Sequence, residues 1–121
     1  MKRRILVVDD SFAMRRMLGA TLEAAGYEIC QASNGSEALA VLDAGGVDLI
    51  VSDVNMPEMD GISFVRKARS RAGSRFLPII MLTTENTTAR VLEGRDAGAT
   101  GWLVKPFHPA KLVEVVAKFL V

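Results

Sequence analysis

The sequence predicts an α/β fold: a doubly wound (βα)5 sandwich in which helices cover both faces of a five-stranded parallel sheet. Two observations carry this prediction. Short runs rich in β-branched residues alternate with longer segments of helical periodicity along the chain. The runs are largely apolar, which is typical of strands buried on both faces of a parallel sheet. With 121 residues, 50% of them hydrophobic, the chain can bury a core as one domain, residues 1–121.

Five apolar runs are expected to form the strands, because β-branched side chains pack well on a pleated surface. They are 5–8 (ILVV), 28–32 (EICQA), 48–52 (DLIVS), 77–82 (LPIIML) and 101–104 (GWLV). Each run is separated from the next by a segment long enough for a helix, as the crossovers between parallel strands require.

Helices are expected at 12–26, 36–44, 62–72, 87–97 and 110–120. In the first of them, Met14, Met17 and Leu18 fall on one face of the helix. Arg15 and Arg16 fall off that face, so the segment is amphipathic. The other helical segments follow the same pattern, and stretch 69–76 (RSRAGSRF) is the most loop-like part of the chain.

Capping residues indicate where the helices begin and end. Asn34 with Glu37 resembles a capping box at the second helix, Asp60 is expected to cap the third, and Pro109 suits the first turn of the last. Glycines stand where helices are expected to stop, at positions 26, 45 and 98.

Charge and composition exclude several classes of function. Lys and Arg number 15 against 14 for Asp and Glu, so the net charge of +1 gives no electrostatic basis for nucleic acid or an anionic membrane as the main partner. The apolar run after the basic N-terminal residues is too short for a secretory signal, and no run approaches the roughly 20 residues of a membrane span. A cytoplasmic protein without membrane insertion is expected. Cys30, the single cysteine, is expected to be a small core residue.

Chemically active residues follow the expected strands at their carboxyl ends. They are Asp9 and Asp10 after the first strand, Asp53 at the third, Thr83 with Thr84 at the fourth, and Lys105 after the fifth. In open parallel sheets, ligands bind beyond these ends. These side chains are therefore expected to converge on one pocket.

This set of residues favours phosphoryl transfer onto a carboxylate. Three carboxylates that are brought together repel one another unless a cation lies among them, and oxygen ligands without His or Cys favour Mg²⁺. A hydroxyl from Thr83 and an ammonium from Lys105 suit the oxygens of a phosphoryl group. Asp53 is the best candidate for a nucleophile, because it ends the central buried strand.

Four motifs, VVDDS, SDVNMPEMDG, MLTTE and AGATGWLVKPF, occur in the order and with the spacings of a known family. Across essentially its whole length the chain resembles a CheY-type response-regulator receiver domain, in particular the stand-alone chemotaxis regulators. The resemblance implies the flavodoxin-like or CheY-like fold with strand order 2-1-3-4-5. It also implies that no output domain follows residue 121.

The resemblance assigns roles at the expected pocket. It makes Asp53 the phosphoacceptor and implies that Asp9 or Asp10, Asp53 and the backbone carbonyl of Asn55 bind Mg²⁺. It implies that Thr83 is the hydroxyl that moves toward the phosphoryl group and that Lys105 is the ion-pair partner of that group.

Further roles follow from the same resemblance. Asn55 and Glu85 stand at the positions that tune the lifetime of the phosphoryl group, and the peptide bond from Lys105 to Pro106 is typically cis in this family. Trp102 falls at the aromatic switch position, where Tyr or Phe is more usual. Because Trp needs more room to rotate inward and its N–H needs a partner when buried, we expect Trp102 to be partly exposed on a docking face with the fourth and fifth helices.

The expected function is a signalling switch and not an enzyme, apart from the handling of its own acyl phosphate. A sensor histidine kinase of the CheA kind is the expected donor, and an effector such as a flagellar motor switch component is the expected target. The protein is expected to be a monomer, with a phosphorylation-dependent dimer as an option. A phosphate sink or phosphorelay intermediate without an effector is an alternative. A flavodoxin-like cofactor-binding protein is a remoter one, because Asp9 and Asp10 would repel a phosphate that lacks a metal.

Overall fold

The structure, a computed structural model, describes residues 2–84 and 88–120. It confirms the predicted sandwich: a five-stranded parallel sheet has the order β2-β1-β3-β4-β5. The strands are β1 (Arg4–Val8), β2 (Glu28–Ala32), β3 (Leu49–Asp53), β4 (Ile79–Thr83) and β5 (Gly101–Val104). The helices are α1 (Phe12–Ala24), α2 (Gly35–Ala44), α3 (Gly61–Arg69), α4 (Thr88–Ala97) and α5 (Pro109–Phe119).

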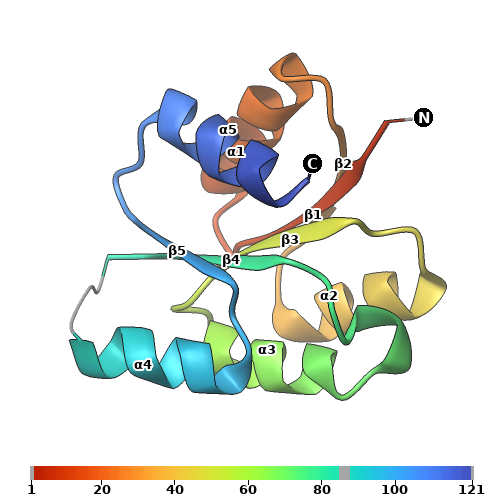
Figure 1. The fold of residues 1–121 in the computed structure, drawn as a ribbon, viewed down its shortest axis with the longest axis vertical. Coiled ribbons are helices and arrows are strands. Elements are labelled where there is room, and N and C mark those ends of the chain that lie inside the picture. The colour runs from red at the N-terminus through yellow and green to blue at the C-terminus, as the bar shows by residue number, and fades with distance from the viewer. Residues whose placement is uncertain (1, 85–87, 121) are drawn as a thin grey trace.

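The helices form two layers, with α1 and α5 on one face of the sheet and α2, α3 and α4 on the other (Figure 1). Each layer encloses its own hydrophobic core, because alternate side chains of a strand point to opposite faces. In β1, Leu6 and Val8 enter the core under α2 and α3, whereas Ile5 and Val7 enter the core under α1 and α5. Every residue of β3 and β4 is buried, so the middle of the sheet is held rigidly from both faces.

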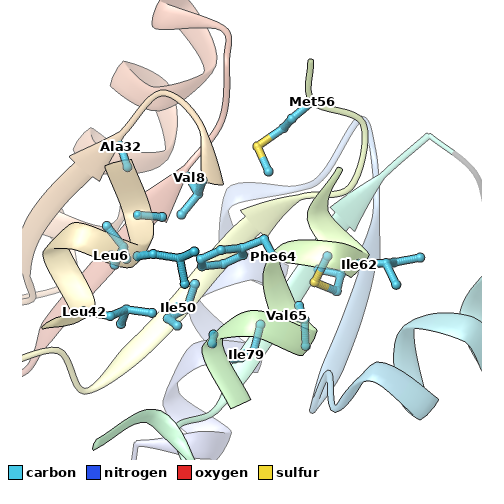
Figure 2. Packing of buried hydrophobic residues seen from close by; sticks show 14 of the residues in the cluster. Leu6, Val8, Ala32, Leu42, Ile50, Met56, Ile62, Phe64, Val65 and Ile79 are labelled. Atoms are coloured by element: carbon cyan, nitrogen blue, oxygen red, sulfur yellow. The ribbon is translucent and has the colours of Figure 1, made fainter. Parts of the chain in front are cut away.

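Phe64 of α3 lies in the middle of the larger core, among Leu6, Ile50 and Ile79 (Figure 2). Its side chain is fully buried, as are those of the three strand residues. Burying an aromatic or a large aliphatic side chain contributes about 1.5–3 kcal/mol each. This packing positions α3, and with it the loop that follows Asp53.

The edge strand β5 is less completely buried than the central strands. Among its residues Leu103 is buried, Gly101 and Trp102 are partly buried, and Val104 is exposed. In the part of the chain that the structure describes, strand β5 pairs on one side only, with β4. Solvent therefore reaches the side chains of Trp102 and Val104.

Several expected boundaries were wrong by one to three residues, and α1 ends at Ala24 instead of 26. The fourth strand begins at Ile79 instead of 77, because Pro78 has no N–H to contribute to a ladder. The third helix ends at Arg69 instead of 72, and a short 3-10 helix, η1 (Ala72–Ser74), follows inside the stretch that was expected to be a loop. The N–H groups of Ser70 and Arg71 donate to the carbonyls of Lys67 and Ala68 and tighten the end of α3.

The expected helix caps are confirmed. Asn34 accepts a hydrogen bond from the N–H of Glu37 at 2.8 Å, and Asp60 accepts one from the N–H of Ser63 at 2.8 Å. Pro109 occupies the first turn of α5. The sequence pattern put Met17 on the apolar face of the first helix with Met14 and Leu18, and this was wrong: 52% of Met17 is exposed, because it lies outside the stripe of α1 that faces the sheet.

A search of the helices within the described residues found none that is both long enough and apolar enough to cross a bilayer.

Candidate functional site

Acidic side chains meet at the edge of the sheet where the strands end. Asp9 directly follows β1, and Asp53 is the last residue of β3. Because β1 and β3 are parallel neighbours, their carboxyl ends lie side by side. One carboxylate oxygen each from Asp9, Asp10 and Asp53 lies within 4.8 Å of the others. The structure thus brings together the three carboxylates that the sequence singled out.

Asp9 is held in place by its own backbone and by the start of α1. Its N–H donates to the carbonyl of Ala32 at 3.2 Å, and its Oδ1 accepts from the N–H of Ser11 at 2.9 Å. The guanidinium of Arg15 donates to the carbonyl of Asp9 at 2.7 Å, a contact that was not predicted from the sequence. Asp9 is buried while Asp10 is exposed, so the cluster opens to solvent on the Asp10 side.

The loop after Asp53 folds back onto the end of β3. The N–H of Gly61 donates to the carbonyl of Val54 at 2.7 Å. A Cβ at position 61 would overlap the backbone oxygen of Asp53 and the Cα of Val54. Only glycine permits this close approach of two backbone segments. The start of α3 therefore braces the backbone of Asp53.

Lys105 connects the carboxylates. Its Nζ lies 3.3 Å from Oδ2 of Asp9 and 3.2 Å from Oδ1 of Asp53. Its backbone N–H donates to the carbonyl of Thr83 at 2.7 Å, and the peptide bond from Lys105 to Pro106 is cis. The ammonium group thus lies between two carboxylates that come from different strands.

The pKa of the Asp53 carboxyl is raised above its ordinary value. Burial is the main cause, because it penalises the charged form, and the negative charge of Asp9 adds to it. The ammonium of Lys105 and the N–H of Asn55, which lies 3.4 Å from Oδ1 of Asp53, act in the opposite direction. Asp53 is therefore a carboxylate with incomplete charge compensation.

The donor set fits a hard divalent cation. Three carboxylates face one ammonium, so the ionised cluster carries an excess of negative charge. All of the ligand atoms are oxygens, and the exposed Asp10 leaves a path for the ion and its waters.

The other predicted site residues lie around this cluster. Thr83 ends β4 and is buried, one position beyond Leu82, which pairs with Asp53 across the strands. Asn55 is exposed and lies two residues after Asp53. Glu85 lies outside the described residues.

Trp102 of β5 is partly buried and packs against α4. Its six-membered ring occupies the space that a side chain at Gly94 would fill. Its indole N–H is buried and, within the described residues, has no hydrogen-bond acceptor. A hollow of about 150 Å³ adjoins the ring, between Val91 and Arg95 of α4. Gly94 was not predicted as part of the site; a glycine inside an expected helix is the only signal that points to it.

Comparisons with known proteins agree with one another. A model of the response regulator receiver domain family matches residues 5–117. Chemotaxis protein CheY1 of Helicobacter pylori is 44% identical over 113 residues, which are 92% of this chain and 91% of that protein. The probable transcriptional regulator ycf27 of Cyanophora paradoxa is 40% identical over 92% of this chain but only 45% of its own length.

Solved structures give the same answer. The chemotaxis protein CheY4 of Vibrio cholerae superposes with a TM-score of 0.95 at 45% identity, covering 98% of this chain and 99% of the other. The receiver domain of the sensor histidine kinase PA1611 of Pseudomonas aeruginosa, solved with a magnesium ion in its active-site cleft, has a TM-score of 0.91 at 28% identity. It covers 99% of this chain and 98% of the other.

Proposed function

The chain belongs to the family of response regulator receiver domains, and on that premise we propose that it accepts a phosphoryl group on Asp53 and passes the signal to a protein partner. One observation carries the proposal. Lys105 Nζ lies between Asp9 and Asp53 at 3.3 and 3.2 Å, at the same strand ends where three carboxylates converge. This arrangement supplies a nucleophile and a cation at the same place.

The bonds that form and break in the transfer involve only the carboxylate and the donor. A carboxylate oxygen of Asp53 forms a bond to phosphorus, while the bond from phosphorus to the donor breaks. The leaving group, an imidazole nitrogen of a phosphohistidine or an oxygen of acetyl phosphate, takes the electron pair. In this proposal Lys105 and Thr83 interact with the phosphoryl oxygens, which carry the charge in the transition state.

Asp9, Asp10 and Asp53 would hold Mg²⁺, with the backbone carbonyl of Asn55 as a further ligand. When bound, the ion supplies charge neutralisation between the incoming phosphoryl group and the carboxylates. The solved relative from Pseudomonas aeruginosa, whose cleft contains magnesium, supports this choice of ion.

The similarity to chemotaxis proteins supports a role in chemotaxis or motility control. A sensor histidine kinase of the CheA kind is the proposed donor. The output is a change in affinity of the face formed by α4, β5 and α5 for an effector such as a flagellar motor component. Trp102 lies on this face and Glu85 precedes it in the chain. The only reactions proposed for the protein are transfer of a phosphoryl group to Asp53 and hydrolysis of the resulting acyl phosphate. The cytoplasmic location stays a prediction.

Intact mass spectrometry after incubation with acetyl phosphate and Mg²⁺ tests the proposal. We expect one phosphoryl adduct on the wild type and none on Asp53→Asn or without Mg²⁺. Asp60→Asn is the matched control: it removes a carboxylate from the same loop, and Asn caps a helix as well as Asp does. An adduct that survives in Asp53→Asn, or that Asp60→Asn abolishes, would contradict the assignment of Asp53.

A further inference from the structure

A basic surface lies at the end of α3 and in the segment that leads to β4. From residue 61 to residue 84 the sequence has no Asp or Glu. We call this group of residues the basic surface: Arg66, Lys67, Arg69, Arg71, Arg75 and the adjoining Phe76. Arg69, Arg71 and Arg75 line one hollow, and Arg66, Lys67, Arg75 and Phe76 are exposed. None of these residues takes part in the acidic site, so the proposed function leaves the basic surface unexplained.

Arg69 gives this surface a defined shape. Its Nε and Nη2 donate to the carbonyl of Gly98 at 3.0 and 2.7 Å, and its Nη1 donates to the carbonyl of Ser74 at 2.9 Å. These bonds tie η1 to the turn between α4 and β5. They leave a hollow of about 320 Å³ whose lining includes Arg69, Arg71 and Arg75.

Most of the positive charge on this surface is uncompensated. Arg71 pairs with Asp43 at 2.7 Å. Within residues 2–84 and 88–120 the structure shows no ion pair for Arg66, Lys67 or Arg75. The negative end of the dipole of α3 accounts for Arg66 and Lys67, which lie in its last turn. It does not account for Arg75, which lies beyond the helix.

Phe76 is the second unexplained feature. It is 90% exposed, the largest exposed fraction among the large hydrophobic residues described. The guanidinium of Arg75 lies 5.9 Å from the centre of its ring. An aromatic side chain that folding leaves in water beside cations is typical of a protein interface.

We propose that this basic surface docks an acidic segment of a partner protein, one that carries an apolar side chain to cover Phe76. Carboxylates are the natural occupants of a hollow lined by guanidinium groups. Arg69 and Arg71 donate their N–H groups to other residues and attract a carboxylate by charge. Arg75, which shows no hydrogen-bond acceptor among the described residues, can bind a carboxylate through two parallel hydrogen bonds. A net charge of +1 gives no long-range attraction to nucleic acid. A flat bilayer surface would reach Phe76 but would not enter the hollow.

The position of the surface determines how it works. The segment between α3 and β4 lies where β4 begins, and the acidic site lies where β1, β3 and β4 end (Figure 1). A partner docked on the basic surface leaves the acidic site open. The docking is therefore constitutive: it holds the partner in both the free and the phosphorylated state, in contrast to an effector that reads the phosphoryl group.

The test measures fluorescence anisotropy of a labelled peptide of about ten residues, rich in Glu and Asp with one central Leu. We expect saturable binding that weakens as salt is raised. Arg75→Gln with Phe76→Ala is expected to weaken binding about tenfold. Beryllofluoride, which mimics the phosphoryl group when magnesium is present, is expected to leave the affinity for the peptide unchanged.

The chain offers a matched control. Phe12 is also exposed, at 63%, and the guanidinium of Arg16 lies 5.9 Å from its ring centre. Arg16→Gln with Phe12→Ala removes the same groups from a different surface and is expected to bind the peptide normally. Equal loss in both double variants, no binding to the wild type, or a beryllofluoride effect would overturn the proposal. So would tighter binding to phosphatidylserine vesicles or to oligothymidylate than to the peptide.

Discussion

The six-membered ring of Trp102 in β5 lies directly over the Cα of Gly94 in α4, in the place of the side chain that glycine lacks. This contact joins the edge strand to the helix beside it, on the face that we propose for output. Because Gly94 has no side chain, the indole of Trp102 fits against α4. A smaller aromatic ring would need less of this space.

Gly94→Ala is expected to displace the indole. Alanine stabilises a helix by about 1 kcal/mol relative to glycine, so the variant would be more stable if its Cβ did not overlap the ring of Trp102. We expect no gain in unfolding free energy, and we expect Trp102 fluorescence to be quenched more readily by acrylamide. Gly73→Ala is the control, because a Cβ at position 73 meets nothing within 4 Å. A stabilised Gly94→Ala variant with unchanged emission would contradict the contact.

Asp53→Asn is expected to be more stable than the wild type at pH 7 in the presence of EDTA. The pKa of Asp53 is raised in the folded state by burial and by Asp9. The stability that comes from its protonated form is complete below the unfolded value of 3.8 and is lost as the pH rises through the higher folded value. The amide carries no charge, so the advantage of the variant should fade as the pH falls toward 3.8. Urea unfolding at both pH values measures this, and an advantage independent of pH would refute the cause given.

Lys105→Met is expected to separate transfer from metal binding. Without the ammonium, which lies 3.3 Å from Asp9 and 3.2 Å from Asp53, the phosphoryl oxygens lose a cationic partner, and labelling by acetyl phosphate should slow about a hundredfold. Mg²⁺ affinity, measured by calorimetry, should be at least that of the wild type, because a cation near the carboxylates has been removed. Lys111→Met removes an exposed lysine of α5 and should change neither. Normal labelling of Lys105→Met would show that the lysine is not needed.

Gly61→Ala is expected to lower the unfolding free energy by about 1–3 kcal/mol, because the new Cβ would overlap backbone atoms of Asp53 and Val54 that cannot rotate away. Mg²⁺ affinity should fall with it, since the carboxylate of Asp53 moves with its backbone. Gly73→Ala again serves as the control and should stay within about 0.5 kcal/mol of the wild type. A Gly61→Ala variant as stable as that control would mean that the loop adapts freely.

The place of Asp53 could be predicted from the sequence because the signal is local. An apolar run ends on a carboxylate, and Pro57 and Gly61 follow within a few residues. The rule that parallel strands end at one edge was then enough to bring Asp9 and Asp53 together.

The contacts between elements could not be predicted in this way. Whether the ring of Trp102 reaches Gly94 depends on how closely α4 packs against the sheet, which no local pattern encodes. The bonds from Arg69 to Gly98 and Ser74 likewise depend on where α3 ends, and the expected end was wrong. Side-chain positions of this kind are decided by tertiary packing instead of periodicity.

The unequal burial of the strands divides the molecule into a part that resists substitution and a part that tolerates it. Asp53 and Thr83 end strands whose every residue is buried, so a change near them disturbs two cores at once. Trp102 belongs to the edge strand, whose outer side chains are only partly covered. Substitutions on this surface during evolution can therefore change which partner the protein binds, one residue at a time, while the proposed phosphoryl chemistry at Asp53 stays the same.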